Sequence, residues 1–141
     1  ATLTPELYRC VIAGAPVSDV FRMMEYETGR FGGASVTYWA EYIGDWRSET
    51  EYITRISPAL NASDVQSPLM IIHGTDDLIV PFEQAEIMAE AMQAAGKPYE
   101  LVAIQDGPHQ SYRMTVENVR ELYTNLERFL FEHNPPDAAT Q

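Results

Sequence analysis

The second half of the chain carries an acid and a histidine in an order that suits acyl-transfer chemistry. An apolar run that starts at Leu69 ends in His73, an acidic pair follows at Asp76 and Asp77, and a lone histidine comes much later, at His109. In acyl transfer, a histidine takes the proton of the nucleophile, and an acid fixes the histidine tautomer and stabilises the imidazolium. We therefore interpret Asp77 as a candidate acid and His109 as a candidate general base.

The nucleophile that would complete this pair is absent from the sequence. The order of acid and then histidine is that of the second half of the Ser…Asp…His triad of α/β-hydrolases, whose serine lies earlier, in a G-x-S-x-G turn. Residues 1–141 contain no G-x-S-x-G motif. We therefore expect the nucleophile to lie upstream of Ala1 or in another chain, and the sequence to be a piece of an enzyme.

The neighbouring polar residues have simpler interpretations. An acid just before a helix commonly serves as an N-cap or turn residue, and Asp76 is the better candidate for that role. His73 ends a buried strand, where one hydrogen bond would satisfy it, so we assign it a structural role. His133 lies near the exposed end of the last helix and is interpreted as solvated. The three histidines and the single cysteine show no metal-ligand spacing, so we expect no metal and no cofactor.

Three short apolar runs, at residues 10–15, 69–73 and 99–104, predict strands. A helix is predicted to start at Pro81, which suits a first helical position, and to stop at Gly96. A last helix is predicted after Thr115, a plausible N-cap. The apolar stripe of the first helix consists of Ala85, Met88, Met92 and Ala95, and that of the second consists of Val116, Val119, Leu122, Leu126, Phe129 and Leu130.

Strands that alternate with helices predict an α/β fold with a parallel sheet flanked by helices. Loops that follow parallel strands emerge at one edge of such a sheet, which is where ligands bind. Asp77 follows the strand at 69–73 and His109 follows the strand at 99–104, so both should project from that edge. If the two strands are neighbours, at a spacing of about 4.8 Å, the carboxylate can reach the imidazole.

An aromatic group precedes these elements. Tyr38, Trp39, Tyr42, Ile43 and Trp46 recur at spacings of three and four, which predicts a short helix with an aromatic face. We interpret the rings as core residues in preference to a substrate-lining surface, because such stripes usually face the interior of a domain. The pair Gly32 and Gly33 is interpreted as a flexible turn.

Composition and charge exclude several classes of protein. The chain is 45% hydrophobic and 21% charged, which is typical of a globular domain. No apolar run approaches the roughly 20 residues that a membrane-spanning helix needs. The formal net charge of −12 argues against nucleic acids and anionic membranes as partners, because both carry negative charge.

Three segments closely resemble the prolyl oligopeptidase family of serine peptidases, in its dipeptidyl-peptidase and acylaminoacyl-peptidase branches. They are AGAPVSD at 13–19, PLMIIHGTDDLIVPFEQ at 68–84 and AAGKPYELV at 94–102, together with the phrase Ser57-Pro58. The resemblance covers nearly the whole chain. The H-G-x-x-D-x-x-V-P core is moderately specific alone and strongly specific with the flanking matches.

The resemblance implies the C-terminal half of an α/β-hydrolase catalytic domain that cleaves peptides near their N-terminus through an acyl-enzyme. It places the acid at Asp77 and the base at His109, and it requires no cofactor. The hydrophobic pocket for the residue before the scissile bond is implied at Val17, Val20, Met23, Tyr26, Ile79 and Val80. Two departures concern this site: Pro108 and Gln110 flank the histidine where the family often has an acid and an aromatic residue, and Val20 stands where tryptophan is usual.

The resemblance divides the chain into a partial peptidase domain at 1–134, which lacks the nucleophile half, and a polar tail at 135–141. The implied partners are a peptide substrate and the missing N-terminal part of the enzyme, which includes the nucleophile half and a β-propeller. The strand at 10–15 would lack a neighbour, so we expect self-association through that edge or binding to the missing part. An esterase or dienelactone-hydrolase relative, or a fragment without catalytic function, is the alternative.

Overall fold

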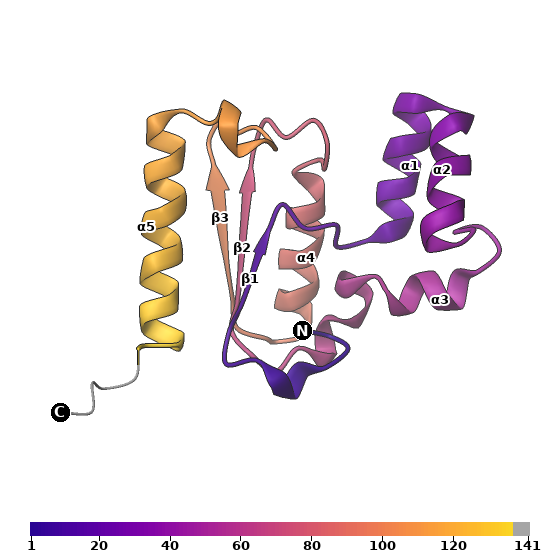
Figure 1. Ribbon diagram of the computed structural model, residues 1–141. Helices are drawn as coiled ribbons and strands as arrows, with labels where there is room; N and C mark the ends of the chain where they lie inside the picture. The colour runs from indigo at the N-terminus through magenta and orange to yellow at the C-terminus, as the bar shows by residue number, and fades with distance from the viewer. Residues whose placement is uncertain (137–141) are drawn as a thin grey trace.

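The computed structural model describes residues 1–136 and contains a three-stranded parallel sheet (Figure 1). The strands are β1 (Val11–Gly14), β2 (Leu69–Gly74) and β3 (Tyr99–Ile104), in the spatial order β1-β2-β3. Leu69 pairs with Val11 on one side and with Tyr99 on the other. The predicted α/β fold with neighbouring second and third strands is therefore confirmed.

The central strand β2 is buried along its whole length. Leu69 and Ile71 face one layer of the core, and Met70 and Ile72 face the other. A strand covered on both faces needs a continuous apolar sequence, which the run LMII supplies. Each of these side chains contributes about 1.5–3 kcal/mol when it leaves water, so β2 is the main anchor of the sheet.

Helix α4 (Glu83–Ala94) covers one face of the sheet together with the 3₁₀ segment Pro58–Asp64. Its predicted stripe packs as expected, with Ala85, Met88 and Met92 buried. The helix ends where Gly96 takes a positive φ of 65°. A side chain rarely adopts that conformation, so glycine suits this position.

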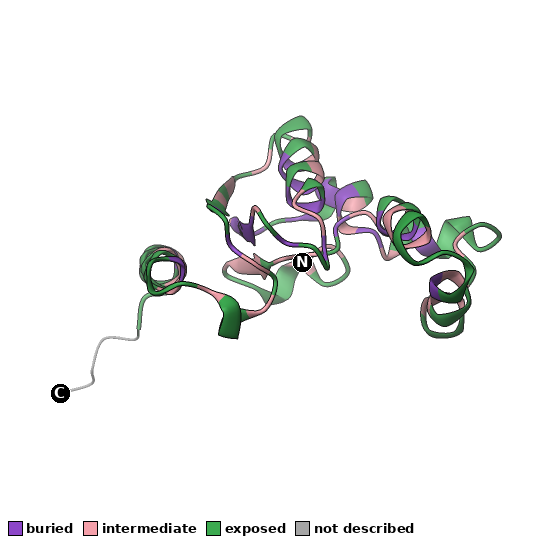
Figure 2. Ribbon diagram, turned by 90° about the horizontal axis from the view of Figure 1, so that it is seen from above, coloured by how far each residue is buried: buried purple, intermediate pink, exposed green. Residues whose placement is uncertain are grey.

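Helix α5 (Val116–His133) lies against the other face, and its burial is weaker than the sequence predicts. The predicted N-cap Thr115 is confirmed, because its hydroxyl accepts from the amide of Asn118 in a capping box. Of the predicted stripe, however, only Phe129 is fully buried, and Val116 and Leu130 are 68% and 42% exposed. The three-stranded sheet is too narrow to cover the stripe, and α5 shows mostly exposed residues when viewed along its axis (Figure 2).

The segment between β1 and the 3₁₀ segment folds into three helices that lie beyond α4, away from the sheet (Figure 1). They are α1 (Val20–Phe31), α2 (Gly33–Ile43) and α3 (Thr50–Arg55). The sequence predicted only one short helix here. The predicted aromatic face also divides, because Trp39, Ile43 and Trp46 pack on a core of their own while Tyr38 and Tyr42 are exposed. Gly32, with a positive φ of 68°, forms the turn between α1 and α2.

The predicted polar tail and the expected lack of a membrane-spanning segment can be compared with the structure. In the predicted tail at 135–141, residues 135 and 136 are exposed, and residues 137–141 lie outside the described part of the chain. Within residues 1–136, no helix is both long enough and apolar enough to cross a bilayer.

Candidate active site

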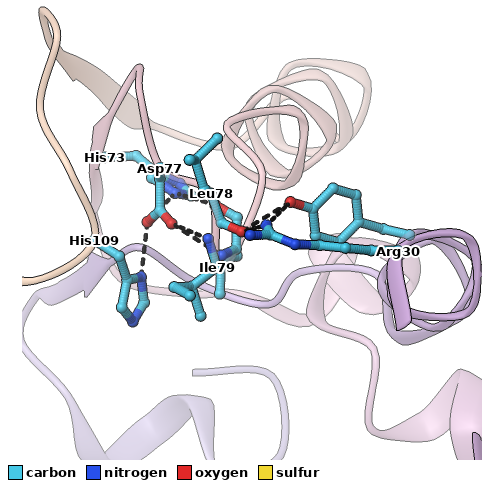
Figure 3. Close-up of polar contacts among 8 residues, drawn as sticks. Arg30, His73, Asp77, Leu78, Ile79 and His109 are labelled. Atoms are coloured by element: carbon cyan, nitrogen blue, oxygen red, sulfur yellow. Dashed lines mark hydrogen bonds and ion pairs between the residues drawn. The ribbon is translucent and has the colours of Figure 1, made fainter. Parts of the chain in front are cut away.

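Asp77 and His109 meet at the carboxyl edge of the sheet (Figure 3). Asp77 lies in the loop after β2, and His109 lies in the loop after β3. The Nδ1 atom of His109 is 2.7 Å from Oδ2 of Asp77, a short distance that is typical of a charge-assisted hydrogen bond. The Asp77 side chain is completely buried and the His109 side chain is 34% exposed. The structure thus brings together the two residues that the sequence paired.

Two glycines allow the loops to approach each other. A Cβ atom on Gly74 would lie 2.0 Å from the carbonyl oxygen of Gly107, so neither loop could carry a side chain at this contact. Three hydrogen bonds cross it. The amide of Thr75 donates to Ile104, the amide of Asp76 donates to Gly107, and the amide of Asp106 donates to the Thr75 hydroxyl. The acid and the histidine are therefore positioned by backbone contacts between their loops.

The sequence assigned the N-cap or turn role to Asp76, and this assignment was wrong, because the side chain that accepts the backbone amides of the turn is that of Asp77. Oδ1 of Asp77 accepts the amides of Ile79 and Val80, each at 2.9 Å. Asp76 is exposed, and its side chain makes no hydrogen bond within residues 1–136. Helix α4 has no side-chain N-cap, since Phe82 occupies that position. One carboxylate thus uses one oxygen to shape its loop and leaves the other for histidine.

A second histidine contacts the same carboxylate oxygen. Nε2 of His73 is 3.1 Å from Oδ2 of Asp77 and 3.0 Å from the carbonyl oxygen of Val80. The side chains of His73 and Asp77 are both completely buried. The structural role predicted for His73 is consistent with these bonds, but the sequence did not indicate that its partner would be the candidate acid.

His109 has one ring nitrogen available for chemistry. Its Nδ1–H donates to the carboxylate, so Nε2 carries the lone pair and can accept a proton. Nε2 has no hydrogen-bond partner within residues 1–136. Beside the ring is a cavity of about 270 Å³ whose lining includes Ala15, the residue after β1, together with Gly74, Ser111 and Met114.

The predicted substrate pocket is spread over two environments. Val20, Met23 and Val80 are buried in the core of the α1–α3 helices, and Tyr26 is partly buried beside them. Val17 and Ile79 are 39% and 42% exposed. The set does not line the cavity beside His109. Its role in substrate binding therefore stays a prediction.

Helix α1 is attached to the loop that carries the acid. The hydroxyl of Tyr26 donates to the carbonyl oxygen of Leu78 at 2.8 Å. The guanidinium of Arg30 donates to the same carbonyl and to the Tyr26 hydroxyl (Figure 3). Arg30 was not predicted as a site residue from the sequence. Its spacing of four from Tyr26 on a helix is the signal that could have linked the two.

Three side chains of metal-ligand type cluster at the other end of the sheet, although the sequence showed no metal-ligand spacing. Ligand atoms of Glu100, Glu132 and His133 all lie within 4.8 Å of one another. Arg128 forms ion pairs with both acids, and its hydrogen bond lowers the pKa of the Glu100 carboxyl. A guanidinium thus already neutralises these acids, and the cluster is interpreted as a surface ion-pair network.

Comparison with known proteins identifies relatives of the chain. The sequence profile of the prolyl oligopeptidase family matches residues 1–134. The uncharacterized peptidase YuxL of Bacillus subtilis (strain 168) is 32% identical over an alignment of 106 residues, and the match covers 62% of this chain and 16% of YuxL. The chain therefore spans about a sixth of the length of this curated relative.

Solved structures support the same fold. An acylaminoacyl peptidase of Pyrococcus horikoshii matches with a TM-score of 0.82 and 21% identity, over 99% of this chain and 22% of that protein. Dipeptidyl peptidase 4 of Porphyromonas gingivalis matches with a TM-score of 0.76 and 23% identity, over 94% of this chain and 17% of that protein. At this level of identity the likeness concerns the fold.

Proposed function

Because the chain belongs to the prolyl oligopeptidase family of peptidases, we propose that it supplies the acid and the general base of a serine-type peptidase. Asp77 is the acid and His109 is the base. The observation that carries this proposal is the hydrogen bond of 2.7 Å between a fully buried carboxylate and a partly exposed imidazole at the carboxyl edge of a parallel sheet. A solvated loop histidine would have no need of a buried partner.

The proposed chemistry follows from the orientation of His109. The nucleophile is a serine hydroxyl supplied from outside residues 1–141, and Nε2 takes its proton as the oxygen attacks the substrate carbonyl. The same nitrogen then returns the proton to the leaving amine. Asp77 fixes the tautomer with hydrogen on Nδ1 and stabilises the imidazolium that forms between the two steps.

The proposed substrates are peptides cleaved near their N-terminus. Support comes from the likeness to proteins described as dipeptidyl and acylaminoacyl peptidases. Ile79 lies two residues after Asp77 and is 42% exposed, and Val17 is 39% exposed. Both side chains can therefore contact an apolar side chain of the substrate. Val20, Met23, Tyr26 and Val80 would form the floor beneath them.

The nucleophile half is proposed to pair with β1. The amides of Val11 and Ala15 point toward β2, where they donate to the carbonyl oxygens of Pro68 and Ile72. Because successive residues of a strand point their backbone groups to opposite sides, Ile12 and Gly14 present theirs to the open edge. An edge of this kind accepts another strand, which can come from the missing part of the enzyme or from a second copy of the chain.

The proposal is tested in a polypeptide that includes the nucleophile. His109→Ala should lower kcat for dipeptide and N-acyl amino-acid anilides by several orders of magnitude, whereas the control His133→Ala should leave it unchanged. Residues 1–141 alone should not turn over these substrates, because the members of a triad act as a unit. Activity that survives His109→Ala would show that the base is another residue.

A further inference from the structure

Two histidines share one oxygen of the candidate acid, and they differ in their surroundings. His109 reaches Oδ2 of Asp77 from a partly exposed loop, and His73 reaches it from the buried strand β2 (Figure 3). The His73 ring also packs edge-on against Phe82, with ring centroids 5.7 Å apart. One of the two donors is therefore held by the core.

The hydrogen-bond partners of His73 determine its tautomer. Nε2 faces Oδ2 of Asp77 and the carbonyl oxygen of Val80, and a carbonyl can only accept. Nε2 must therefore carry the hydrogen. Nδ1 is buried and has no partner within residues 1–136, so a hydrogen at that position would be left unsatisfied. Both observations point to neutral imidazole protonated on Nε2.

The Nε2–H of His73 contacts two residues of the loop between β2 and α4, which we call the acid loop. It lies between the side chain of Asp77 and the carbonyl oxygen of Val80, three residues further along that loop. The amides of Ile79 and Val80 already hold Oδ1 from within the loop. Oδ2 has no donor from the loop, and its two partners are the ring nitrogens of His73 and His109. His73 is therefore the group from the core that holds this oxygen beside His109.

We propose that His73 is a positioning residue, whose Nε2–H orients Oδ2 of Asp77 toward Nδ1 of His109. The inference rests on the proposed function for its relevance to catalysis, since Asp77 is the acid there. The orientation itself is a property of the folded chain and can be measured without turnover.

The first measurement uses the unmodified 141-residue chain. Long-range ¹H–¹⁵N correlation spectra report which ring nitrogen of each histidine carries hydrogen. We expect Nε2–H for His73 and Nδ1–H for His109. His73 found with its hydrogen on Nδ1 would overturn the proposal.

The second measurement compares variants by the downfield proton signal of the hydrogen-bonded Nδ1–H, which is assigned to His109 by its loss in His109→Gln. His73→Phe keeps an aromatic ring but removes the donor, so the signal should be lost or shifted upfield. His73→Gln places an amide N–H close to the position of Nε2 and should restore the signal. Phe82→Leu, which removes only the packing partner, should retain it.

These outcomes separate a positioning role from a packing role. A folded His73→Phe variant with the unmodified signal would overturn the proposal, as would loss of the signal in Phe82→Leu alone. If His73→Phe does not fold, the tautomer measured in the unmodified chain decides. Failure of the proposed function would appear differently, as peptidase activity that survives His109→Ala while the spectra remain as expected.

Discussion

The backbones of Gly74 and Gly107 touch at the point where the loops that carry Asp77 and His109 leave the sheet. A Cβ atom on Gly74 would lie 2.0 Å from the carbonyl oxygen and 2.5 Å from the carbonyl carbon of Gly107. The atoms in the way belong to the backbone, so they cannot move aside as a flexible side chain would. The distance between Asp77 and His109 therefore depends on two residues that carry no functional group.

Gly74→Ala should destabilise the protein by at least about 1–3 kcal/mol, the usual cost of overpacking. Urea unfolding measures this free energy. Gly14→Ala is the matched control, because Gly14 also ends a parallel strand but has nothing within 4 Å of its Cβ position. Equal stability of the two variants would contradict the close contact.

Asp77→Asn and Asp76→Asn should differ sharply in a polypeptide that includes the nucleophile. Asp77→Asn removes the acceptor that fixes the His109 tautomer, and the equivalent change in a serine protease lowers kcat by roughly 10⁴. Asp76 is exposed, so its change should be mild. Steady-state kinetics decides, and a larger loss in Asp76→Asn would reassign the acid.

Arg30→Met should loosen the acid loop with little effect on global stability. Arg30 is exposed and donates to the carbonyl of Leu78, so its loss should cost no more than about 1 kcal/mol. Hydrogen exchange at the amides of Ile79 and Val80 should become faster. Arg22→Met, which removes surface ion pairs from the same helix, is the control that should leave these amides unchanged.

The ion pair of Glu100 with Arg128 should make stability depend on pH. The hydrogen bond from Arg128 lowers the pKa of Glu100 below its ordinary value of 4.5 in the folded state. The stabilisation is therefore fully present above that value and is lost as the pH falls through the lowered pKa. Thermal unfolding of the unmodified chain and of Glu100→Gln should differ near neutral pH and converge in acid. A constant difference across this range would show that the ion pair contributes nothing.

The open edge of β1 should support self-association when the nucleophile half is absent. Gly14 directs its amide to that edge, so Gly14→Pro removes a donor that β2 does not use. Sedimentation velocity at micromolar concentration should show oligomers for the unmodified chain and for Gly14→Ala, and fewer for Gly14→Pro. A strictly monomeric unmodified chain would contradict the expectation.

The sequence predicted the elements that are defined by local pattern. The strand at 69–73 and the N-cap at Thr115 depend on apolar continuity and on one hydroxyl, and both are confirmed. Helix α1 was missed, although the side chain of Asp19 caps its start by accepting from the amide of Arg22. Whether Asp76 or Asp77 shapes the loop depends on which side chain is enclosed after the chain folds. Adjacent residues of the same type carry no signal for that choice.

The register of the sheet has a consequence for the order of folding. The chain between Leu69 and Tyr99 is about half as long as the chain between Val11 and Leu69, so pairing β2 with β3 closes the shorter loop. The difference in the entropic free energy of loop closure is small, since each doubling of loop length adds only about 0.6 kcal/mol. Contacts between residues closer in sequence nevertheless form faster. We expect β2, α4 and β3 to assemble first, with Asp77 inside that unit and His109 in the loop that leaves it, and β1 to dock last. Pulse-labelled hydrogen exchange that finds β1 amides protected as early as those of β3 would refute this order.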